Sequence, residues 1–140
     1  LVESLIRCGV GMMTVIDPDI VDITNIPRQT FFVESDVGSS KVDVVKRGIN
    51  EINRNVLVMT VDKLIGSSSD LKPYIENTTL VINCSDYPDV DTTNEIVSEA
   101  CFQYSLPHIL CGGYDGHASF IGQTVSAVIM ALVGFLPGYG

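Results

Sequence analysis

Positive charge is scarce in this sequence. Only 8 lysines and arginines stand against 17 aspartates and glutamates, which gives a formal net charge of -9 at pH 7. Proteins that hold the phosphate backbone of nucleic acids need clustered positive charge on their surface. We therefore expect no nucleic-acid partner.

Long apolar runs are also missing. The most apolar stretch, Val125 to Leu136, is about a dozen residues long, whereas a helix needs roughly 20 residues to span a bilayer. We predict a buried helix over this stretch and expect no membrane partner. The first residues lack the basic start, apolar middle and cleavage site of a secretion signal, so we expect none.

The four cysteines are scattered along the chain, and no two of them form a CxxC pair. Such spacing fits neither a zinc site nor a dense disulfide framework, and it favours a reducing, cytoplasmic location. Free cysteines are usually small buried side chains. Cys111 is the first candidate for a reactive thiol, because it lies near the Gly112-Gly113 turn.

Apolar periodicity predicts helices that alternate with strands. Of the 140 residues, 46% are hydrophobic, which is enough for one sizeable core. Before the apolar stretch at the end, the expected order is a helix over 1–8, a strand over 12–16, a helix over 39–52, a strand over 56–61, a short helix over 71–75, a strand over 80–83, a helix over 91–104, a strand over 107–110 and a strand over 117–125. This alternation is typical of a doubly wound, mostly parallel α/β sheet of the Rossmann kind.

Two places look physically incomplete. A doubly wound sheet needs a strand before its first helix, but the sequence opens directly in a helical pattern. No turn signal separates the strand expected over 117–125 from the apolar stretch that follows it. We expect chain segments to be missing before Leu1 and near Val125.

Carboxylates follow two of the predicted strands. Asp17 ends the first strand and Asp86 follows the third. Ligands of doubly wound sheets bind outside the carboxyl ends of the strands, where an acid can bond ribose hydroxyls or hold Mg²⁺ beside phosphates. Asp17 alone could equally cap the turn before Pro18. Asp86 could cap the next helix, although Asp89 or Asp91 could take that place.

Two cations follow Asp17 in the sequence. Arg28 comes eleven residues later, and Lys41 stands at the start of a predicted helix after Gly38. A lysine in the first turn opposes the helix dipole. It becomes favourable if the lysine and the arginine hold a phosphate together. A solvated surface lysine is the alternative.

The order of these residues resembles the ThiF/MoeB/HesA family of adenylating enzymes, which includes the ubiquitin-activating enzymes. The similarity extends to about Val125 and rests on Arg7-Cys8-Gly9-Val10-Gly11, Asp17-Pro18-Asp19, Asn25-Ile26-Pro27-Arg28-Gln29, Val37-Gly38-Ser39-Ser40-Lys41, Asn53 and Cys84-Ser85-Asp86. The run Ser85-Asp86-Tyr87-Pro88 looks closer to the MccB-type branch, which adenylates peptides, than to enzymes that act on ubiquitin-like proteins.

The resemblance implies that residues 1–140 form an ATP-binding adenylation domain, incomplete at its start, that uses ATP and Mg²⁺. Its implied site comprises Asp17 for the ribose, Asn25, Arg28 and Gln29 for the triphosphate, Lys41 for the charge on the phosphates, Asp86 for Mg²⁺, and Tyr87 in place of the family's usual Asn. Arg28, Lys41 and Asp86 would be the catalytic residues. The family's glycine-rich loop and paired CxxC zinc motifs are absent from this sequence, so any structural Zn²⁺ would be held by residues not present here.

The reaction implied by the resemblance is attack by the C-terminal carboxylate of a peptide or ubiquitin-like protein on the α-phosphate of ATP. A terminal carboxyl has an unperturbed pKa of about 3.3 to 3.7, so it is ionised at neutral pH and needs no general base. Catalysis then rests on positioning and on positive charge at the phosphates. Members of the family are commonly homodimers, so we expect one here.

Two other functions fit the same fold. An NAD-dependent dehydrogenase would explain Asp17 but not Arg28, Lys41 and Asp86 together. A non-catalytic peptide-recognition module would keep the fold without the chemistry, and Tyr87 favours it slightly. Adenylation is the function that the sequence predicts.

Overall fold

The computed structural model describes residues 1–110 and 130–134, and its helices and strands alternate as predicted over the first of these ranges. The elements are α1 (Val2–Arg7), β1 (Met12–Ile16), η1 (Ile23–Asn25), η2 (Glu34–Asp36), α2 (Lys41–Ile52), β2 (Leu57–Val61), α3 (Ser68–Ile75), β3 (Leu80–Asn83), α4 (Val90–Gln103), β4 (His108–Leu110) and β5 (Met130–Gly134), where η denotes a short 3-10 helix.

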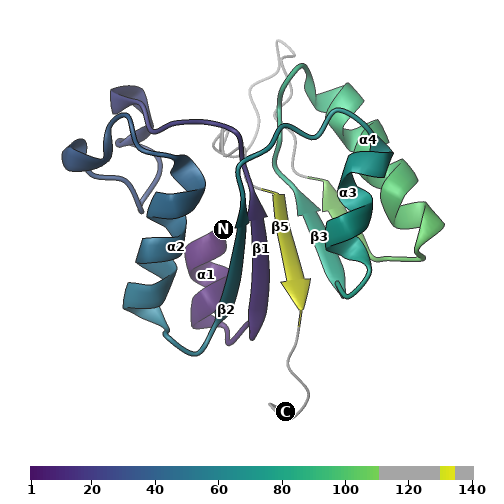
Figure 1. Ribbon diagram of the computed structural model, residues 1–140, viewed down its shortest axis with the longest axis horizontal. Coiled ribbons are helices and arrows are strands. Elements are labelled where there is room, and N and C mark those ends of the chain that lie inside the picture. Colours follow the sequence, from purple (N-terminus) through teal and green to yellow (C-terminus); the bar gives the residue numbers. More distant parts are fainter. Residues whose placement is uncertain (111–129, 135–140) are drawn as a thin grey trace, which may run out of the picture.

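The strands form one five-stranded sheet in the order β2-β1-β5-β3-β4, with β5 at its centre (Figure 1). β1 pairs with β2 and β3 pairs with β4 in parallel, while β5 is antiparallel to both β1 and β3. Four of the five strands therefore run in one direction. The predicted mostly parallel α/β fold is confirmed.

The central position of the sheet holds an unexpected strand. In a doubly wound sheet the strand between β1 and β3 is a parallel one that precedes the first helix. Here the antiparallel β5 lies in that position. The helix predicted over Val125 to Leu136 is thus wrong over 130–134, because a continuous apolar run fits a central strand and a buried helix equally well.

Three further predictions concern the start of α3 and the chain near Val125. α3 begins at Ser68, three residues before the predicted start at 71, and Asp70 lies in its first turn, where the helix dipole favours an acid. The strand expected over 117–125 and the segment expected to be missing near Val125 lie outside the described residues.

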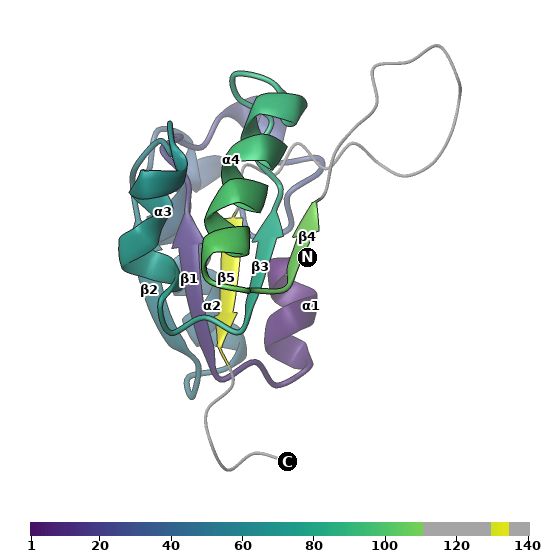
Figure 2. The same ribbon diagram turned by 90° about the vertical axis from the view of Figure 1, so that its right-hand side faces the viewer.

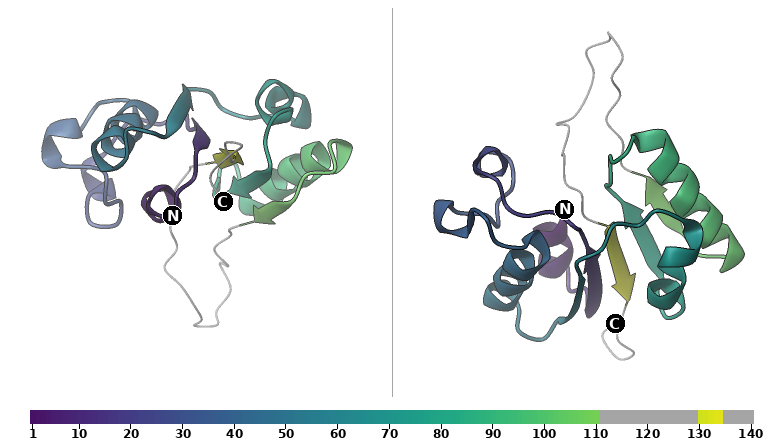
Figure 3. Two further views of the ribbon diagram at one scale, coloured as in Figure 1. Left: turned by 90° about the horizontal axis from the view of Figure 1, so that it is seen from below. Right: turned by 45° about the horizontal axis from the view of Figure 1, so that its top comes forward.

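Helices cover both faces of the sheet, which makes it doubly wound (Figures 2 and 3). One core packs α1 and α2 against the sheet and includes Ile6, Met13 and Ile49, all at most 1% exposed. The opposite core packs α3 and α4 and includes Leu71 and Val97, both fully buried. Among the described residues, no helix is long and apolar enough to cross a membrane.

The middle of α2 makes one close contact that depends on a glycine. Gly48 faces the aromatic ring of Phe31, and a Cβ atom built on Gly48 would overlap that ring. Phe31 itself packs against the core under α1 and α2. The glycine therefore lets the loop after η1 lie directly on the helix.

We expect Gly48→Ala to lower the free energy of unfolding by about 1 kcal/mol, because the overlap with Phe31 costs about 1–3 kcal/mol and alanine regains about 1 kcal/mol of helix propensity. Urea unfolding monitored by circular dichroism measures the difference. Asn50→Ala, at an exposed position of the same helix, is the matched control and should cause no loss. Equal stabilisation by both substitutions would contradict the contact.

Candidate functional site

The carboxyl ends of β1 and β3 lie at the same edge of the sheet, the upper edge in Figure 1. Because β5 separates the two strands, their ends are two strand spacings apart, about 10 Å. Asp17 directly follows β1, and Asp86 comes shortly after β3. A ligand at this edge can therefore meet both carboxylates.

Asp17 is completely buried at the end of β1. Its Oδ1 accepts a hydrogen bond of 2.8 Å from the Asp19 amide, whereas its Oδ2 is buried without a partner among the described residues. Burial raises the pKa of the Asp17 carboxyl from its ordinary value of 3.8 to about 7, although the Asp19 amide and the Lys41 charge act in the opposite direction. Asp17 thus has an oxygen that a ligand hydroxyl could satisfy.

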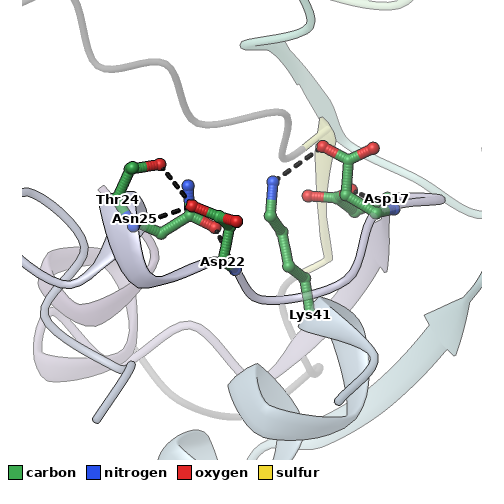
Figure 4. A network of polar contacts seen from close by, with 6 residues as sticks. Asp17, Asp22, Thr24, Asn25 and Lys41 are labelled. Carbon is green, nitrogen blue, oxygen red and sulfur yellow. Dashed lines mark hydrogen bonds and ion pairs between the residues drawn. The ribbon is translucent and has the colours of Figure 1, made fainter. Parts of the chain in front are cut away.

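Lys41 is a buried cation at the first position of α2, and its side chain is only 6% exposed. Its Nζ forms an ion pair of 2.7 Å with the Asp19 carboxylate, which is half exposed. Figure 4 shows the lysine side chain reaching from α2 toward the loop that carries Asp17. The solvated surface lysine considered as an alternative is therefore wrong.

Backbone hydrogen bonds hold the two segments that carry this ion pair. The Lys41 amide donates to the Asp19 carbonyl at 3.0 Å, and the Val21 amide donates to the Ser39 carbonyl at 2.8 Å. The Gly38 amide donates to the Val21 carbonyl at 2.9 Å. Gly38 has a φ of 88°, a conformation that favours glycine, so the turn before α2 depends on this residue.

Ser40, the residue before α2, adds a second unpartnered oxygen. Its Oγ is buried and, within the described part of the chain, has no hydrogen-bond partner. Although Ser40 is at the N-cap position, its hydroxyl does not cap the helix. Buried polar atoms are nearly always satisfied in native proteins, so two unsatisfied oxygens near Lys41, on Asp17 and on the adjacent Ser40, indicate a place for a ligand.

The predicted triphosphate residues lie in and after η1. Asn25 is buried, and its Oδ1 accepts from the Asp22 amide at 2.9 Å, so this oxygen stabilises the loop (Figure 4). Arg28 is exposed and donates from Nη1 to the Thr24 carbonyl at 2.6 Å. Gln29 follows it, and its amide donates to the Asn25 carbonyl at 3.0 Å.

Arg28 and Lys41 both lie near the Asp22 carboxylate. Hydrogen bonds from Thr24 hold the pKa of Asp22 below its ordinary value, and the charges of Arg28 and Lys41 lower it further. The Asp22 carboxylate therefore lies within electrostatic reach of both cations.

Asp86 and Tyr87 lie on the loop between β3 and α4. Both side chains are exposed, with Tyr87 at 61%, and within residues 1–110 the Asp86 carboxylate takes part in no hydrogen bond or ion pair. Asp89 is the N-cap residue of α4 and accepts from the Thr92 amide at 2.8 Å. Asp86 is therefore not the helix cap and remains available to a cation.

Three residues have a part in this region that the sequence pattern does not indicate. Asp19 pairs with Lys41, and Asn83 and Thr93 lie beneath the Asp86 loop. Asp19 could have been found, because its charge stands two residues from Asp17 and a buried lysine needs a counterion. No local signal marks Asn83 and Thr93, which are ten residues apart and meet only in the folded chain.

Comparison with known proteins identifies the family of this chain. The model of the ThiF family matches residues 1–134. The molybdopterin-synthase adenylyltransferase of Escherichia coli is 30% identical over 105 residues, which are 75% of this chain and 41% of the relative. The adenylyltransferase and sulfurtransferase UBA4 of Debaryomyces hansenii is 36% identical over 93 residues, which are 66% of this chain and 20% of the relative.

Solved structures show the same relationship. The crystal structure of E. coli MccB with ATP is 28% identical, has a TM-score of 0.70, and is matched over 76% of this chain and 32% of that chain. The chain spans less than half the length of these relatives. Since the family match extends over almost its whole length, the chain belongs to the ThiF family.

Proposed function

We propose that the protein uses ATP to adenylate the C-terminal carboxylate of a peptide or a ubiquitin-like protein. The observation that carries the proposal is the pair of buried oxygens without partners, on Asp17 and Ser40, beside the buried cation Lys41. Family membership supports it, since relatives are named as adenylyltransferases. The NAD-dependent dehydrogenase considered above has no such support.

Each part of the site matches one part of ATP. The free Oδ2 of Asp17 is placed to accept from a ribose hydroxyl, as acids at this position of the fold do. The Lys41 ammonium would neutralise charge on the phosphates. Arg28 and Gln29, on the loop after η1, would contact the triphosphate as well. Asn25 contributes by holding that loop, because its side-chain oxygen is bonded to the Asp22 amide.

Asp86 has the properties of a Mg²⁺ ligand. Its carboxylate is exposed and free of protein partners among the described residues, and no group of three or more metal-binding side chains occurs there. Mg²⁺ beside a nucleotide is usually held by one or two carboxylates together with phosphates and water. The ion would supply positive charge to the phosphates, and Tyr87 would lie next to it.

The chemistry needs no protein nucleophile. A carboxylate oxygen of the substrate attacks the α-phosphorus, a new oxygen–phosphorus bond forms, and the bond to the bridging oxygen breaks to release pyrophosphate. Charge builds up on the phosphate oxygens during this displacement. Lys41, held in place by Asp19 at 2.7 Å, is a preorganised cation of the kind that stabilises such charge.

Four further features remain predictions. The MccB-type branch, the homodimer and the cytoplasmic location are expectations from the sequence, and the relatives named above include an adenylyltransferase and an adenylyltransferase that is also a sulfurtransferase. The domain assignment over residues 1–140 belongs with them. Pyrophosphate release with a panel of peptides would show which carboxylates are accepted.

We expect the protein to release pyrophosphate from ATP when given peptides with free C-termini and not when the same peptides end in an amide. Lys41→Ala should lower the rate at least about a hundredfold, in line with the loss of a transition-state donor. Asp86→Ala should also lower the rate, because it removes the assigned Mg²⁺ ligand. Arg54→Ala is the matched control, because Arg54 is an exposed cation just before the amino end of β2, at the opposite edge of the sheet from the site.

Calorimetry with ATP and Mg²⁺ separates binding from chemistry. Arg28→Ala and Asp86→Ala should both weaken ATP binding. Unchanged affinity in both variants would disprove the assigned site. Normal ATP binding without pyrophosphate release on any peptide would instead favour the non-catalytic recognition module.

Nucleotide binding should depend on pH through Asp17. A ribose hydroxyl bonds the ionised carboxylate best, and burial raises the pKa of this group to about 7 in the free protein. The ionised fraction then grows about tenfold between pH 6 and pH 8, so affinity should rise by about tenfold and level off above that range. Adenosine is the best probe, because it has no phosphate that titrates.

The Asp17→Asn variant tests the assignment of this pH dependence. It should bind adenosine with an affinity that does not change between pH 6 and pH 8. The binding can be followed by NMR titration of the amide signals near β1. An equal slope in the variant and in the parent protein would show that another group is responsible.

A further inference from the structure

The loop that carries Asp86 is held from beneath by a closed ring of hydrogen bonds. Asn83, the last residue of β3, is fully buried, and its Oδ1 accepts from the Ser85 amide at 3.1 Å. Its Nδ2 donates to Thr93 Oγ1 at 3.3 Å, and Thr93 Oγ1 in turn donates to the Ser85 carbonyl at 2.8 Å. We call this ring of Asn83, Ser85 and Thr93 the Ser85 clamp.

The clamp fixes both backbone groups of Ser85, the residue directly before Asp86. The Ser85 amide donates to Asn83, at the end of β3, and the Ser85 carbonyl accepts from Thr93, in the first turn of α4. A second bond from Asn83 Nδ2 to Asn94 Oδ1 at 2.8 Å orients the amide. The peptide unit that leads into Asp86 is therefore tied at once to the sheet and to a helix.

The cost of burying these polar groups indicates that the arrangement is specific. A buried amide and a buried hydroxyl are costly unless every bond is made. Thr93 is only 4% exposed and Asn83 is not exposed at all. Asp89 caps α4 through Thr92. The Thr93 hydroxyl reaches the Val90 carbonyl in the first turn at 3.0 Å and the Ser85 carbonyl at the shorter distance of 2.8 Å, so it ties the start of the helix to the loop before Asp86.

We propose that Asn83 and Thr93 are positioning residues that set the Asp86 carboxylate for Mg²⁺ bound to the nucleotide. This inference rests on the proposed function, because Asp86 is the assigned metal ligand there. The clamp itself touches neither metal nor nucleotide. Groups behind a metal ligand orient it, and their loss typically costs about 10- to 100-fold in metal affinity.

The test is ATP binding by calorimetry over a range of Mg²⁺ concentrations. Thr93→Val keeps the shape of the side chain and removes the hydroxyl, so the Mg²⁺ concentration for half-maximal enhancement of ATP binding should rise about tenfold. Binding of ATP without Mg²⁺ should stay unchanged. Thr93→Ser restores the hydroxyl and should restore the Mg²⁺ response.

Thr78→Val is the matched control. Thr78 is also buried, and its hydroxyl donates to the Tyr74 carbonyl at 3.0 Å on α3, away from the Asp86 loop. It should leave the Mg²⁺ response unchanged. An unaltered response in Thr93→Val, or equal shifts in Thr93→Val and Thr78→Val, would overturn the positioning role while leaving the proposed function intact.

Two further variants keep the result decisive. If Thr93→Val does not fold, Asn94→Ala removes one acceptor of the Asn83 amide at a partly exposed position. It should raise the required Mg²⁺ concentration by less than Thr93→Val does, because only one acceptor of the Asn83 amide is lost, and no change would overturn the inference. Asp86→Ala should abolish the Mg²⁺ response; a normal response there would refute the metal assignment of the proposed function, and the inference with it.

Discussion

Lys41 carries a positive charge that is almost removed from water, and the loop after β1 supplies the carboxylate that pairs with it. A buried ammonium is stable only with a nearby counterion and further hydrogen bonds. Asp19 supplies the counterion, and the Asp17 carboxylate accepts a hydrogen bond from the Asp19 amide, which fixes the Asp19 backbone. The turn at Gly38 then brings the start of α2 to this loop. The cation is thus fixed before any ligand arrives.

Much of this arrangement could be predicted from sequence, because its signals are local. A short apolar run ending in Asp17, and another followed closely by Asp86, mark two parallel strands with acids at their carboxyl ends. Lys41 stands out because a cation is unusual in the first turn of a helix. Fold rules then place the three residues at one edge of the sheet, where the structure has them.

Other features could not be predicted, because their causes are not local. The apolar run that contains β5 has no alternation, since a central strand is covered on both faces and reads like a buried helix. The contact between Asn83 and Thr93 joins residues separated by a loop. For Arg28 the motif predicts the residue but not the position of its side chain. The exposed side chain bonds the Thr24 carbonyl of its own loop.

The central strand β5 controls the distance between the two halves of the site. Within the described residues, β1 and β3 are not paired to each other; both are paired to β5. The width of the site, from the Asp17 side to the Asp86 side, is therefore set by two antiparallel ladders on a single five-residue strand. Any shift of β5 changes that width directly. A strand that carries none of the assigned site residues thus sets the spacing between the Asp17 end and the Asp86 end of the site.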